Sequence, residues 1–142
     1  MAMTVDQFVE RVEYWRKRMC PEWHVGVTDD DPGEVSGHDQ ESWVACTSND
    51  LTIAEILIHY RPVLLTYKRR DIDRIIVHEL THSLLDRVLD HDRALEPHVG
   101  SVQWEIYRET RRPDMEEFVN RMAHCIVDGQ TLMTTRKLTS HS

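Results

Sequence analysis

Two histidines and a glutamate lie within residues 78–82, as His78, Glu79 and His82. Histidines four residues apart lie about one turn apart on a helix, so both imidazoles can bind one metal ion. Neutral imidazole is a usual ligand of zinc. Glu79 would lie beside the ion without binding it, where its carboxylate can take a proton from a water molecule. The run therefore predicts a zinc site at His78 and His82, with Glu79 as general base.

A hydrolytic zinc site has three protein ligands and an open fourth position, so a third ligand must follow later in the chain. Glu116 is the first candidate, because it falls on the apolar stripe formed by Val119, Met122, Ala123 and Ile126. A carboxylate on such a stripe is costly unless it is paired or bound to metal. Glu105 and Glu117 remain alternatives. Asn120, one turn after Glu116, is placed to hydrogen-bond a ligand.

The other histidines near the motif are weaker candidates. His91 and His98 fall at an expected helix end and in a loop. The metzincin spacing requires glycine and histidine three and six residues after His82, and the chain has Leu85 and Val88 there. A group that stabilises a developing oxyanion is also needed. The candidates for it are His91, His98, Tyr60 and Tyr107.

The residues around the motif predict an α+β arrangement. Thr4 and Gln7 form a capping box ahead of an amphipathic stripe, which predicts a helix over 4–19. Three strands are expected, at 22–28, 42–47 and 51–60, and the acidic segment 29–41 is expected to be a loop. Three further helices are expected, at 71–90 with Asp71 as its cap, at 98–111 and at 113–128.

Composition limits the chain to one domain of moderate size. It has 142 residues, 40% of them hydrophobic, and we expect a domain over 1–128 with a polar, flexible tail over 129–142. The net charge of −8 argues against nonspecific binding to nucleic acid or to an anionic membrane. No segment has the apolar pattern of a signal peptide or of a membrane span, so we expect neither. Three cysteines without a close pair favour a reducing, cytoplasmic location.

The motif helix, His78 to Asp86, resembles that of the thermolysin-like gluzincins, which are zinc peptidases with a glutamate ligand on a later helix. The order of elements is similar to that of compact zincin-like proteins of phages and mobile elements. In those, a glutamate before a Val-Asn-x-Leu-Ala-like run is the third ligand; it corresponds to Glu116, with Met122 in place of the leucine. The thermolysin-like second motif is absent. The resemblance implies a three-stranded sheet beside the motif helix, and a cleft between that helix and an edge strand, expected at 51–60.

Together these features favour a zinc-dependent peptide hydrolase, in which His78, His82 and Glu116 hold Zn²⁺ and Glu79 activates water. Its partner would be a peptide or protein substrate, and the pattern does not determine the oligomeric state. Two other interpretations remain. One is a zinc-stabilised binding or regulatory domain without turnover. The other is a helical protein whose histidines bind nothing.

Overall fold

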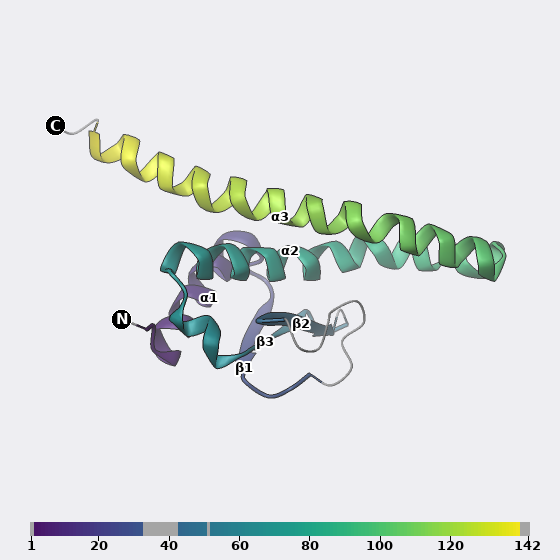
Figure 1. The fold of residues 1–142 in the computed structure, drawn as a ribbon, viewed down its shortest axis with the longest axis horizontal. Coiled ribbons are helices and arrows are strands. Elements are labelled where there is room, and N and C mark those ends of the chain that lie inside the picture. Colours follow the sequence, from purple (N-terminus) through teal and green to yellow (C-terminus); the bar gives the residue numbers. More distant parts are fainter. Residues whose placement is uncertain (1, 33–42, 51, 140–142) are drawn as a thin grey trace.

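The computed structural model describes residues 2–32, 43–50 and 52–139 of the chain, and these have an α+β fold. Figure 1 shows its layers: the long helix α2 lies between α3 on one side and the small sheet on the other. The elements in chain order are α1 (Val5–Met19), β1 (His24–Thr28), β2 (Ala45–Asp50), β3 (Glu55–Tyr60), the 3₁₀ helix η1 (Pro62–Thr66), α2 (Arg69–Arg93), the 3₁₀ helix η2 (Glu96–His98) and α3 (Ser101–Thr139).

Helix α1 confirms the element predicted at the N-terminus. The Thr4 hydroxyl accepts a hydrogen bond from the Gln7 backbone N–H at 3.1 Å, and the Gln7 side chain accepts one from the Thr4 N–H at 2.9 Å. This capping box satisfies two N–H groups that the first turn would otherwise leave unpaired. The apolar stripe of α1 is buried through Phe8, Val12 and Trp15.

The sheet has the strand order β1-β3-β2, with β1 parallel to β3 and β2 antiparallel to it. The prediction of an edge strand at 51–60 is therefore wrong, because β3 is the central strand and begins only at Glu55, after a turn over 52–54. Ala54 adopts a positive φ of 50° in this turn. Among the described residues, β2 pairs only with β3, which makes it an edge strand, and it lies against α2. The acidic segment predicted as a loop lies mostly outside the described residues.

Hydrogen bonds fix which main-chain groups of β2 face the open edge. The Arg61 N–H donates to the Val44 carbonyl at 2.8 Å. Hydrogen-bonded and non-hydrogen-bonded pairs alternate along an antiparallel ladder. The N–H and C=O groups of Ala45, Thr47 and Asn49 are therefore directed away from β3, toward the open edge of the sheet.

Helix α2 begins at Arg69, two residues before the predicted cap, and Asp71 lies in its first turn. Its inner face is fully buried at Ile72, Ile76, Val77 and Leu80. These side chains join one core with the aromatic residues of α1 and with Ile56, Ile58 and Tyr60 of β3. Since both neighbouring layers pack against α2, the motif helix is the central element of the fold.

Helix α3 differs most from the sequence prediction. Residues 98–111 and 113–128 were expected to form two helices, but Pro113 lies inside one helix that continues to Thr139. The helix therefore also runs through most of the segment predicted as a flexible tail. Trp104, Val119, Ala123 and Val127 are buried along it. Within the described residues, no helix is both long enough and apolar enough to span a membrane.

Candidate metal centre

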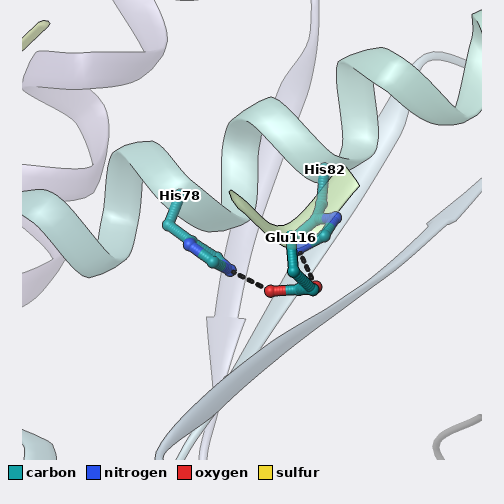
Figure 2. Close-up of side chains that lie close together, drawn as sticks. All are labelled: His78, His82 and Glu116. Carbon is teal, nitrogen blue, oxygen red and sulfur yellow. Dashed lines mark ion pairs between the residues drawn. The ribbon is translucent and has the colours of Figure 1, made fainter. Parts of the chain in front are cut away.

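Three side chains predicted as zinc ligands, two from α2 and one from α3, lie together in the structure (Figure 2). The Nε2 atoms of His78 and His82 lie 3.6 Å and 2.8 Å from the two carboxylate oxygens of Glu116. One ligand atom from each residue falls within 4.8 Å of the other two. Tetrahedral zinc with bonds of about 2.0–2.1 Å places its ligand atoms about 3.3 Å apart. The group can thus close on one ion with small side-chain movements.

The contact between His82 and Glu116 is short but is not a hydrogen bond. His82 Nε2 is buried and has no hydrogen-bond partner, although Glu116 Oε1 lies 2.8 Å away. We attribute this to direction: the donor and acceptor angles of a hydrogen bond are not met, so the nitrogen and the oxygen approach each other without forming a hydrogen bond. A buried ring nitrogen left unpaired costs free energy. A metal ion bound between the two atoms would satisfy both.

Helix geometry places the two histidines side by side. Their ring centroids are 4.7 Å apart, with 68° between the ring planes. The opposite face of this turn is anchored by Val77 and Leu80, which are fully buried. The Thr81 hydroxyl also donates to the Val77 carbonyl at 2.7 Å, which fixes its side chain within the helix. The side chains of His78 and His82 are 17% and 25% exposed, so both rings are partly open to solvent, although His82 Nε2 itself is buried.

Glu79 is 5% exposed and lies just behind the ligand group, with Oε1 3.9 Å from His78 Nε2. Burial, and then repulsion by the Glu116 carboxylate, raise the pKa of Glu79 to about 8. A hydrogen bond from the Thr47 side chain opposes this rise. A bound cation would favour the ionised carboxylate in the same way as any nearby positive charge. Next to a bound cation, Glu79 would therefore be an ionised carboxylate that can accept a proton.

The packing of α3 selects Glu116 among the candidate carboxylates. Val119 and Ala123, on the predicted stripe, are buried, and Glu116 extends the same face toward α2. Glu117 points away, is 60% exposed and pairs with Arg121 at 2.7 Å. Glu105 is 66% exposed. Neither alternative belongs to the cluster of possible metal ligands.

The other predicted site residues lie elsewhere in the structure or outside the described residues. His98 is exposed at the end of η2, and the side chain of His91 lies outside the described residues. Tyr107 is 44% exposed on α3. Tyr60 is 5% exposed and packs against Phe8, with ring centroids 4.9 Å apart. Because it is a core residue, Tyr60 is a poor candidate for stabilising an oxyanion.

A cleft of about 520 Å³ leads to His78 and Glu79 from the N-terminal side of α2. The start of β2 forms one wall and α3 the other. Among the polar residues that line it, Tyr67, Arg74 and His124 were not predicted from the sequence, whereas Asn120 was expected near the ligands. Helical spacing could have identified two of the three: Arg74 precedes His78 by one turn, and His124 follows Glu116 by two.

Beyond the cleft, ion pairs hold α2 and α3 together. Asp128 accepts hydrogen bonds from Arg70 at 2.6 Å and from Arg74 at 3.0 Å. Hydrogen bonds and charge from both guanidinium groups lower the pKa of Asp128 below its usual range. This network fixes the register between the helix that carries the histidines and the helix that carries Glu116.

The sequence matches no protein-family model, and comparisons with curated proteins and with solved structures gave no match. The chemistry of the site is therefore inferred from its own residues and geometry.

Proposed function

We propose that this chain is a zinc-dependent peptide hydrolase of the gluzincin type, built on a minimal zincin-like fold. The observation that carries the proposal is the convergence of Glu116 on the two histidines, with His82 Nε2 buried beside it and without a hydrogen bond. Two imidazoles and one carboxylate are a ligand set that zinc uses in catalytic sites, where a fourth position stays open for water. Bound there, zinc would acidify that water and polarise a substrate carbonyl.

Glu79 is the proposed general base. Its carboxylate lies 3.9 Å from His78 Nε2, which puts it within reach of a water in the open position. It would accept the proton of the attacking water and then deliver it to the leaving amine. Thr47 hydrogen-bonds the carboxylate and so orients it toward the ligand group. This division of roles matches the expectation that Glu79 acts beside the metal without ligating it.

The edge of β2 is the proposed docking place for the substrate. Ala45, Thr47 and Asn49 direct main-chain N–H and C=O groups to this edge, and Ala45 also lines the cleft. An extended peptide can add to such an edge by main-chain hydrogen bonds. Its scissile carbonyl would then lie over α2, next to Glu79. Tyr67 and His124, which line the same cleft, replace Tyr60 as candidates for stabilising the oxyanion.

Glu79→Gln tests the proposal, because the amide is nearly isosteric but cannot accept a proton. Zinc-loaded wild type should cleave members of a mixed peptide library, and a chelator should abolish the cleavage. Glu79→Gln should retain one zinc per chain and lose about 10²–10⁴-fold in rate. Glu117→Gln, an exposed acid on α3, is the matched control and should cleave normally. Cleavage by Glu79→Gln at the wild-type rate would exclude Glu79 as the base.

A zinc-stabilised binding domain is the second candidate, and one observation favours it. The three ligand side chains come from two different helices, so a bound ion would cross-link α2 to α3 and stabilise the fold without any reaction. The same experiment separates the two functions. If zinc-loaded wild type cleaves no peptide of the library, while zinc still raises the unfolding temperature, the binding domain is the better description.

A further inference from the structure

A serine and a histidine are hydrogen-bonded on the face of the sheet that points away from α2. Side chains alternate along a strand, and Thr47 and Asn49 face α2, so Ser48 projects from the opposite face. Ser48 Oγ lies 3.0 Å from His59 Nε2 of the neighbouring strand. Ser48 is exposed, whereas His59 is only 7% exposed. The pair is therefore separated from the metal ligands by the sheet.

A backbone carbonyl fixes which ring nitrogen of His59 carries the proton. His59 Nδ1 lies 3.1 Å from the Asp30 carbonyl oxygen, which can only accept a hydrogen bond. In the neutral ring, Nδ1 is therefore the donor and Nε2 is the acceptor. The Ser48 hydroxyl then donates its proton to Nε2. The Asp30 carbonyl is itself held in place, since the Asp30 N–H donates to the Thr28 hydroxyl at 3.1 Å.

We propose that Ser48 is a nucleophilic serine that accepts acyl groups, with His59 as its base. The geometry has the three parts that activate a nucleophile: a hydroxyl, a base within 2.6–3.2 Å, and a third group that orients the base. A structural serine–histidine pair would need no opening beside the hydroxyl. Here a pocket of about 300 Å³ lies next to Ser48.

The lining of this pocket indicates the class of acyl donor. Ile53 and Leu57 offer apolar surface for a short acyl chain, and Ile53 is 58% exposed. Asp50 and Glu55 add two acidic side chains. Hydrogen bonds from Thr52 keep the pKa of Asp50 below its usual value, so this carboxylate is ionised at neutral pH. We assign the pocket to small esters or thioesters that combine an apolar acyl group with a cationic leaving group.

The reaction balances without any cofactor. Ser48 Oγ attacks the carbonyl carbon, and its proton passes to His59 Nε2. The bond to the leaving group then breaks, and the protonated His59 donates that proton to the departing oxygen or sulfur. The products are an acyl ester on Ser48 and a free alcohol or thiol. The Asn49 N–H, which follows Ser48 in the chain and is directed away from β3, would donate to the developing oxyanion.

Acylation of the full-length protein with butyrylthiocholine tests the proposal. Peptide mass mapping should locate one butyryl group on Ser48, in zinc-loaded and in chelator-treated wild type alike, because the adduct does not depend on the metal centre. His59→Gln should slow the labelling of Ser48 by at least about 10²-fold, the lower range for loss of a general base. His24→Gln, the same change at an exposed histidine of β1, is the matched control and should label normally.

Two further comparisons keep the test decisive if His59→Gln fails to fold. In the wild type, butyrylthiocholine should acylate Ser48 at least about 10²-fold faster in the native chain than in the same chain unfolded by urea. The cationic thioester should also react about fivefold faster than its neutral 3,3-dimethylbutyl analogue, the factor for one ion pair in water. Equal labelling of native and unfolded Ser48, or butyryl groups only on lysines and Cys125, would overturn the assignment.

Discussion

Replacing Glu116 by alanine removes one of the three proposed zinc ligands and leaves both histidines in place. Structural zinc sites with four ligands bind with about 10–16 kcal/mol at neutral pH, or about 2.5–4 kcal/mol per ligand. Because about 1.4 kcal/mol corresponds to a factor of ten, the loss of Glu116 should weaken zinc binding about 10²–10³-fold. This estimate applies to Glu116, because its carboxylate oxygens lie 2.8 and 3.6 Å from the Nε2 atoms of His82 and His78.

Thermal unfolding with and without zinc measures this effect. At free zinc of about 100 times the wild-type Kd, binding should add about 2.7 kcal/mol to the stability of the wild type. For Glu116→Ala, with a Kd about 100-fold higher, the same zinc adds only about 0.4 kcal/mol. For a chain of this size, about 4 °C per kcal/mol converts these values to shifts of about 11 °C and about 2 °C. Chelator should reverse both shifts.

The metal-free protein separates loss of a ligand from loss of fold. Glu116 is 42% exposed, and its charge raises the pKa of Glu79 by repulsion. Its replacement should therefore change the stability of the zinc-free chain by no more than about 0.5 kcal/mol. Glu117→Ala is the matched control: it removes only an exposed pair with Arg121 and should keep the full zinc-induced shift. A wild-type zinc shift in Glu116→Ala, or its loss in Glu105→Ala instead, would refute the assignment.

Two predictions concern groups outside the metal centre. Cys20 and Cys46 are each 1% exposed, and burial raises the pKa of both thiols to about 11, so Ellman's reagent should modify only Cys125 rapidly in the native protein. Rapid modification of a second thiol would contradict the packing of the core. Asp128 has a folded pKa below its unfolded value, so its pairing stabilises the fold above pH 4 and is lost as pH falls through the folded pKa. The difference in urea stability between wild type and Asp128→Asn should therefore be present at pH 7 and vanish in strong acid; a difference independent of pH would exclude this linkage.

Local patterns were sufficient to predict the elements that carry the candidate site. The capping box at Thr4 and Gln7 identified α1, and the spacing of His78 and His82 identified one face of α2. The choice of Glu116 over Glu117 followed from the apolar stripe on α3. A helix buries one face, and the apolar residues of that face can be identified from their spacing in the sequence even when the partner helix is unknown.

The arrangement between distant elements was not predictable in the same way. Strand β3 became central because it pairs with β1 on one side and β2 on the other, a choice that depends on contacts far apart in the sequence. Pro113 predicted a helix start, since proline inside a helix costs about 3 kcal/mol. In the structure, packing of α3 along α2 through Val119, Ala123 and Val127 offsets this cost, and the helix continues. Tertiary contacts therefore decided both cases.

The Asn49 side chain donates a hydrogen bond to Asp86 of α2 at 2.8 Å. Asn49 lies two residues after Thr47, whose side chain is hydrogen-bonded to Glu79 of the same helix. Two successive inward residues of β2 are thus tied to α2. A slip of one residue in β2 would turn both side chains to the opposite face of the sheet and would detach Glu79 from its partner. The length of β2 is consequently a constraint on the chemistry of the site: an inserted residue within Ala45–Asp50 should disable it.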